Sequence, residues 1–146
     1  MKKLLFLSII PAAIAASAGC ATTQKEEALS PKAAAKLAQF ERTGKMQDCV
    51  PIANLNQITP LSDKLFLVRV GVDDYYLNEV SGKCSGASSS FNYLQYSTSL
   101  SQLCRNEIVH VVDSTTHSFV GSCGIGSFEK LTKKAPEAME SQAPKQ

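Results

Sequence analysis

Hydrophobic and polar positions divide the chain into stretches with three different periods. Residues 4–14 are an almost continuous apolar run. Residues 31–44 repeat their apolar positions at a spacing of three, as on a helix with a narrow apolar stripe. From Asp48 onward the period falls to two, which is typical of β-strands. The pattern therefore predicts an N-terminal apolar segment, one short helix and a mainly β domain.

The predicted helix begins at Ser30 and Pro31. Serine caps free backbone N–H groups, and proline is favoured in the first turn of a helix. Good helix formers follow as far as Gly44, with Leu37 and Phe40 in the apolar stripe. A helix of about 13 residues is marginal on its own in water. We therefore expect it to dock on the domain, and binding to a partner or to a membrane surface is the alternative.

Several short stretches of the domain alternate as strands do. They are residues 64–72, 75–80, 107–113 and 118–128, preceded by the weaker 49–58. Gly121, Gly124 and Gly126 suit a curved strand or a bulge. The Ser-rich, aromatic segment 84–104 predicts a long loop or a short helix. Short strands separated by turns predict a small antiparallel barrel or sandwich of about five to six strands, preceded by one short helix.

The first 19 residues have the composition of an export signal. Two lysines precede the apolar run, which is about half the roughly 20 residues that a membrane-spanning helix needs. Ser-Ala-Gly-Cys at residues 17–20 matches a lipobox except that Ser17 stands where Leu or another large apolar residue is usual. In a lipobox, cleavage precedes lipidation of the cysteine sulfur, here that of Cys20. Ala21, by resemblance to enterobacterial lipoproteins, favours the outer membrane. We expect a lipid anchor there, facing the periplasm; cleavage after Ala18, giving a soluble periplasmic protein, is the alternative.

The number of cysteines supports lipidation. The chain has five, and an exported protein meets oxidising surroundings in which thiols pair. Lipidation of Cys20 leaves an even set: Cys49, Cys84, Cys104 and Cys123. Three pairings are possible, and we favour the nested one. In a meander that closes on itself Cys49 would meet Cys123, while Cys84–Cys104 would close the base of the Ser-rich segment. No two form a C-x-x-C motif, so neither a redox site nor a zinc knuckle is predicted.

The expected organisation has four parts. They are a lipoprotein signal peptide (1–19), a tether with a short helix (20–47), a disulfide-stapled β domain (48–131) and a disordered tail (132–146). The chain has 15 Lys+Arg against 13 Asp+Glu, and removal of the signal takes two lysines, so the mature charge is balanced. Nucleic-acid binding depends on clustered Lys and Arg. Without such a cluster, we expect no nucleic-acid partner.

Candidate catalytic residues are few. His110 and His117 are the only histidines, and their spacing of seven is not typical of metal ligands. A hydrolase would need a cleft that joins one of them to Asp113, Ser122 or Glu107. We therefore expect no enzyme, no catalytic residue, no metal and no cofactor. A small periplasmic hydrolase, or an inhibitor of an envelope enzyme, is the alternative.

Aromatic residues are the best candidates for a binding surface. They are Tyr75, Tyr76, Phe91, Tyr93 and Tyr96. Tyrosines at a loop edge offer apolar area and a hydroxyl, which suits glycan, peptide or protein surfaces. The alternative is that they close the open end of the core. We expect a non-enzymatic envelope lipoprotein with a binding or accessory β domain, whose partner is an envelope protein or a glycan.

Four stretches of the domain share a pattern with known proteins. They are CVPIANL from Cys49, LFLVRVGVDDYYLNEV running on to Cys84, LCRNEIVHVVD from Leu103 and SCGIGSFEKL from Ser122. On these, the domain resembles a family of small exported bacterial proteins of uncharacterised function. The resemblance covers about residues 49–131 and implies a four-cysteine β frame but no activity. The family often carries a Trp soon after the first cysteine; this chain has none, and we expect Leu55 or Ile58 to fill that volume.

Overall fold

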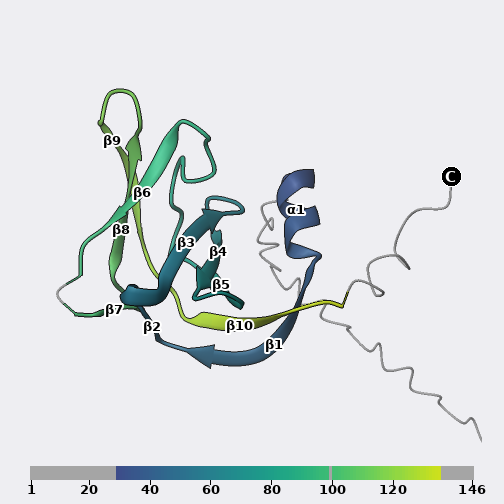
Figure 1. Ribbon diagram of the computed structural model, residues 1–146. Helices are drawn as coiled ribbons and strands as arrows, with labels where there is room; N and C mark the ends of the chain where they lie inside the picture. Colours follow the sequence, from purple (N-terminus) through teal and green to yellow (C-terminus); the bar gives the residue numbers. More distant parts are fainter. Residues whose placement is uncertain (1–28, 99, 136–146) are drawn as a thin grey trace, which may run out of the picture.

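The computed structural model describes residues 29–98 and 100–135 (Figure 1). Its elements are α1 (Pro31–Leu37), β1 (Phe40–Gln47), β2 (Cys49–Pro51), the 3-10 helix η1 (Ile52–Asn54), β3 (Leu55–Pro60), β4 (Leu65–Val70), β5 (Asp74–Glu79), β6 (Asn92–Tyr96), β7 (Gln102–Cys104), β8 (Ile108–Asp113), β9 (Phe119–Gly124) and β10 (Phe128–Lys133). All strand pairs are antiparallel. The predicted mainly β, sandwich-like fold is confirmed, with more strands than the five to six expected and no closed barrel in the described part.

The sandwich has three layers (Figure 1). A five-stranded sheet in the order β1-β10-β5-β4-β3 lies between α1 and a three-stranded sheet in the order β6-β8-β9. Strands β2 and β7 form a separate two-stranded sheet. The middle sheet is therefore buried on both faces: Phe66, Val68 and Val70 of β4 face the three-stranded sheet, and Leu67 faces α1. This explains why β4 reads as a nearly continuous apolar run.

Helix α1 begins as predicted but is shorter. The Ala33 N–H donates to the Ser30 hydroxyl at 3.2 Å, and Pro31 occupies the first turn. Ala33 is buried against the middle sheet, so the predicted docking is confirmed. The helix ends at Leu37, and the predicted continuation to Gly44 is wrong because those residues form β1. Pairing of β1 with β10 overrides helix propensity, which is a weak preference. The β domain thus begins at Phe40, before the predicted start at residue 48.

The Ser-rich segment between Cys84 and Cys104 contains strands β6 and β7. The prediction of a long loop or a short helix is therefore wrong. Strand β6 alternates regularly, with Leu94 and Tyr96 packed against the core and Gln95 exposed. Because β6 has only five residues and serines lie on both sides of it, its alternation of core-facing and exposed residues is too short to be recognised in the sequence.

All four cysteines of the domain form disulfides, but the nested pairing is wrong. The bonds join Cys49 to Cys104 and Cys84 to Cys123. The ends of the meander do meet, as expected, but β1 and β10 make that contact, and Cys49 lies beyond β1. Cys49 instead lies directly opposite Cys104 in the pair β2–β7. Cys84 follows β5 and reaches Cys123 in β9.

The predicted signal peptide, Cys20 and residues 136–146 of the predicted tail lie outside the described residues. The start of that predicted tail, residues 132–133, belongs to β10. Within the described ranges no helix has the length and apolarity needed to cross a membrane. Export and lipid anchoring therefore remain predictions.

Candidate functional site

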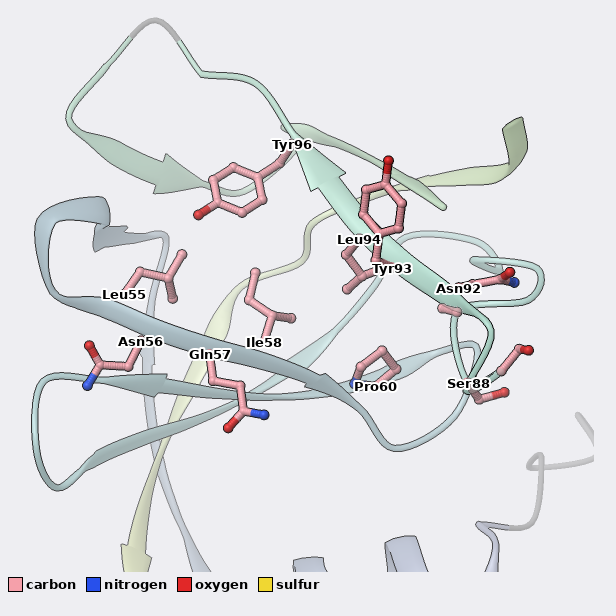
Figure 2. Close-up of a pocket in the computed structure, with 12 residues that line it drawn as sticks. Leu55, Asn56, Gln57, Ile58, Pro60, Ser88, Asn92, Tyr93, Leu94 and Tyr96 are labelled. Carbon is pink, nitrogen blue, oxygen red and sulfur yellow. The ribbon is translucent and has the colours of Figure 1, made fainter. Parts of the chain in front are cut away.

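A groove of about 520 Å³ opens between the edge strands β3 and β6 (Figure 2). Its apolar floor packs partly against the core and consists of Leu55, Ile58, Leu94 and Tyr96. Its other lining residues are Asn56, Gln57, Pro60, Ala87, Ser88, Ser89, Asn92 and Tyr93. The volume lies within the roughly 300–1,000 Å³ of ordinary ligand sites. The groove therefore has the size, the apolar floor and the polar rim of a binding site.

A bulge shapes the β3 wall. In a regular strand, residues 55 and 57 would share a face. The register with β4 shifts between Leu55 and Gln57, so Leu55 and Ile58 share the face toward the groove instead. Figure 2 shows both side chains directed toward β6, while Gln57 points the other way. These two residues were expected to replace the volume of a family tryptophan; they form the floor of the groove and pack on the core.

The β6 wall is regular. Strand β6 pairs with β8 in unbroken register from Asn92 to Tyr96. Because side chains alternate, Leu94 and Tyr96 point toward the core and the β3 wall, as Figure 2 shows. Tyr93 points outward and is 42% exposed at the rim. The site thus combines one bulged wall and one regular wall.

Asp63 fixes one end of the groove. Its carboxylate accepts hydrogen bonds from the N–H of Gly86 at 3.2 Å and from the N–H and hydroxyl of Ser88 at 3.1 and 2.8 Å. Burial alone would raise the pKa of Asp63, but these hydrogen bonds and the nearby Lys83 ammonium hold that pKa below its ordinary value. The sequence alone did not identify Asp63 as part of a site. Its one local signal was its place in a turn between two strands.

The structure separates the five aromatic residues predicted as one surface. Tyr93 and Tyr96 line the groove. Tyr76 is buried in the core between the sheets, and Tyr75 packs into the cluster beneath α1. Phe91 is 70% exposed and does not line the groove. The predicted surface is therefore reduced to its two β6 tyrosines, and the other lining residues were missed.

The groove carries no ionisable side chain other than tyrosine. None of its described lining residues is Asp, Glu, Lys, Arg, His or Cys. A charged group of a ligand would find no counter-charge among these side chains, and burying a charge without a partner is costly. The lining favours an uncharged ligand.

The two histidines lie in strand β8 and in the turn between β8 and β9. His110 lies opposite Ser122 in the β8–β9 pair, and its ring packs 5.8 Å from that of Phe119. His117 lies in the turn between these strands, with its ring 6.4 Å from that of Tyr93. Neither lines the groove. The structure therefore places both on the outer side of the three-stranded sheet or its tip.

The nearby carboxylates hold turns of the backbone. Asp113 accepts hydrogen bonds from the N–H groups of Thr116 and Thr115 at 2.8 and 2.9 Å, and these bonds lower its pKa. Glu107 accepts a hydrogen bond from the Cys104 N–H at 2.6 Å. Within residues 29–98 and 100–135, no three His, Cys, Asp or Glu side chains converge as they would around a metal ion. The structure does not gather the candidate catalytic residues into one cleft.

Comparison with protein families places the whole chain in one of them. Residues 1–146 match the family of unknown function DUF6491, and the chain belongs to that family. Neither the comparison with curated proteins nor that with solved structures found a match. The expected membership of an uncharacterised family is confirmed, but the family brings no activity with it. The groove is thus the feature from which a function has to be argued.

Proposed function

We propose that this member of a family without an assigned activity is a non-enzymatic lipoprotein of the cell envelope, whose small β domain binds a ligand in the periplasm. The observation that carries the proposal is the uncharged, tyrosine-edged groove between β3 and β6. General acid–base catalysis most often uses His and also Asp, Glu, Lys, Cys or Tyr, and of these residue types only tyrosine lines the groove. An apolar floor with a polar rim suits recognition better than hydrolysis.

Cysteine use supports the envelope location. Of five cysteines in the chain, four form the two disulfides, which leaves Cys20. Disulfides persist in oxidising compartments outside the cytosol, in agreement with the export signal read at the N-terminus. Lipidation would use the odd thiol. Ser30 lies 10 positions after Cys20, and a chain of that length reaches at most about 35 Å, so an outer-membrane anchor would hold the domain close to the membrane surface.

Two measurements on the full chain in its producing cells test this proposal. Labelling with an alkyne fatty acid is expected to mark the native protein and to be lost in Cys20→Ser. A photoreactive phenylalanine analogue at Tyr96, whose side chain points toward the β3 wall of the groove, is expected to give a crosslinked adduct. The same group at Gln95, an exposed β6 residue outside the lining, serves as the matched control.

Each measurement can contradict its own half of the proposal. An unlabelled native protein would remove the lipid anchor. Crosslinking at Tyr96 no stronger than at Gln95 would remove the groove as the binding site. A catalytic activity that is lost on replacement of His110 or His117 would overturn the non-enzymatic function.

A further inference from the structure

We propose that the groove binds an extended, uncharged segment of another protein, which adds to the edge of β6 as an extra strand. This inference rests on the proposed function, because it names the ligand class of the same groove. Strand addition supplies affinity through main-chain hydrogen bonds and specificity through alternate side chains. The structure offers both.

In the described part of the chain, the two walls of the groove are strand edges with no neighbouring strand, and at the start of β6 only the Asn92 N–H is already bonded, to the Ser89 carbonyl at 3.3 Å. Strands β3 and β6 each end their sheet, and within the described ranges no backbone hydrogen bond joins one to the other. In an edge strand, every second residue turns its N–H and C=O away from the paired neighbour. Those groups face the groove on the β6 side. Another polypeptide backbone matches such a row of alternating donors and acceptors.

Other edges of the two larger sheets are protected against strand addition. Strand β1 has a bulge between Arg42 and Met46 and carries charged side chains along its length. The C-terminal half of the outer edge of β9 is covered, because the Ser81 N–H donates to the Gly124 carbonyl at 2.8 Å and Cys84 is bonded to Cys123. Bulges, charges and covering loops are the usual means by which proteins block their edges.

Strand β3 is also poorly suited to pair with an added strand because it has a bulge, whereas β6 is well suited. The register of β3 shifts after Leu55, and the strand ends at Pro60, which has no N–H to donate. Strand β6, NYLQY, has unbroken register and contains no Pro, Gly or charged residue. We therefore place the added strand on β6, with β3 as the opposite wall.

The side chains of the groove define the sequence that fits. A segment paired with the 5 residues of β6 spans about 17 Å. Its alternate residues would lie on the same side as Leu94 and Tyr96, above Leu55 and Ile58, and should therefore be apolar. The residues between them face the amides and hydroxyls of the rim or solvent. Because no charged residue lines the groove, Lys or Asp in an apolar position would be rejected.

The test uses the full chain, purified in mild detergent with its disulfides intact. It is titrated against an array of N-acetylated, C-amidated heptapeptides that alternate Val, Ile, Leu, Phe or Tyr with Ser, Thr, Asn or Gln. Controls of the same composition have their apolar residues in one block, and others carry Lys or Asp at the central apolar position. Chito-oligosaccharides are titrated in parallel. A subset of alternating neutral peptides is expected to bind at least tenfold more tightly than all controls.

Two variants locate the binding. Ile58→Trp fills the floor of the groove and is expected to weaken peptide binding at least tenfold. Ile108→Trp places the same side chain at an exposed position of β8 outside the groove and should have no effect. Should Ile58→Trp fail to fold, Leu55→Glu, at the other floor position of the β3 wall, decides the question. It is expected to favour the central-Lys peptides over the central-Asp peptides, a preference that the native chain should lack.

Backbone methylation distinguishes an added strand from a ligand held by its side chains alone. The tightest peptide is N-methylated at either alternate set of residues. At least one set is expected to lose binding tenfold or more, because every second N–H points to β6. Equal binding of both methylated peptides and the parent would overturn strand addition, as would an array without a selective binder. Chito-oligosaccharide binding that is lost in Ile58→Trp would overturn it too, yet would leave the proposed binding function intact.

Discussion

Replacement of Gly126 by alanine is expected to destabilise the fold far more than the same replacement at Gly124. Gly126 lies where the chain passes from β9 into β10, against the backbone of β5. A Cβ at Gly126 would lie 1.9 Å from the Glu79 carbonyl oxygen. A Cβ at Gly124 would lie 3.5 Å from the Ser81 Cβ, which is ordinary van der Waals contact. The two variants therefore differ in how close the added methyl group lies to its neighbours, and in Gly126→Ala that neighbour is the backbone of β5.

The magnitude follows from the clash and from the hydrogen bonds that it breaks. Overpacking costs about 1–3 kcal/mol when neighbours can move, and here the neighbour is the backbone of β5. Asn78, which is 0% exposed, donates to the Gly126 carbonyl at 2.8 Å and accepts from its N–H at 3.2 Å. Leaving this buried amide unpaired costs about another 1–3 kcal/mol. We expect Gly126→Ala to lower the free energy of unfolding by about 3–5 kcal/mol and Gly124→Ala by less than about 1 kcal/mol.

Urea unfolding of the full chain with intact disulfides, followed by far-UV circular dichroism, measures both values. Wild type, Gly126→Ala and Gly124→Ala should share one m-value, so that the midpoints compare directly. Free energies of unfolding for the two variants within about 1 kcal/mol of each other would refute the close packing of β5 against this corner.

Three further predictions concern charge, covalent structure and the groove. Hydrogen bonds from Arg42 to Glu129 and from the Ser-rich segment to Asp63 hold the pKa values of these two carboxyl groups below their ordinary range. The free energy of unfolding should therefore be highest above about pH 4.5 and should fall as the pH decreases and the carboxylates become protonated. Urea midpoints measured against pH check this, and Glu129→Gln should make the midpoint less dependent on pH. Tryptic digestion without reduction should release three peptides still joined by the two disulfides, because the peptide of residues 84–105 contains two cysteines and no tryptic site between them. The nested pairing would instead release that peptide on its own. A further chymotryptic cut after Tyr93 separates the two disulfides into different fragments. Tyr93→Ala should weaken groove binding, while Phe91→Ala, which removes an exposed ring outside the groove lining, should leave binding unchanged.

Strands were predictable where their burial pattern is local. The alternation of β8 follows from a core on one side of the strand, and the apolar run of β4 follows from burial on both sides; each can be recognised within one short window. The β1 segment FERTGKMQ has no such alternation, and its burial pattern is one buried residue followed by seven exposed ones. Its conformation depends on pairing with β10, about 90 positions away, as the pair Arg42–Leu131 shows. The sequence of such an edge strand contains no local pattern that distinguishes it from a helix, so its helix-forming residues led to the wrong prediction.

The groove was predictable only in part, because its walls come from distant segments. Tyr93 and Tyr96 were found from their chemistry, since tyrosine suits recognition wherever it lies. Leu55 and Ile58 share a face only because of the bulge in β3, which no spacing rule indicates. The anchoring role of Asp63 depends on hydrogen bonds to residues more than 20 positions away. Local patterns thus identify candidate side chains, while long-range pairing decides which of them meet.

The crossed disulfides bear directly on the β6 wall. The two bonds close loops with sequence separations of 55 and 39, each worth about 4 kcal/mol by the chain-entropy estimate. Both loops include the segment from Cys84 to Cys104, so this segment is fixed to the rest of the fold at both ends. The Cys84 N–H also donates to the Asp63 carbonyl at 2.8 Å.

Strand β6 lies inside this doubly fixed segment and is therefore held opposite β3 without being paired to it. A wall held in place before binding loses little conformational freedom when a ligand arrives, which favours affinity from a contact of only five residues. The nested pairing would instead have closed the Ser-rich segment on itself, with neither of its ends bonded to another part of the fold.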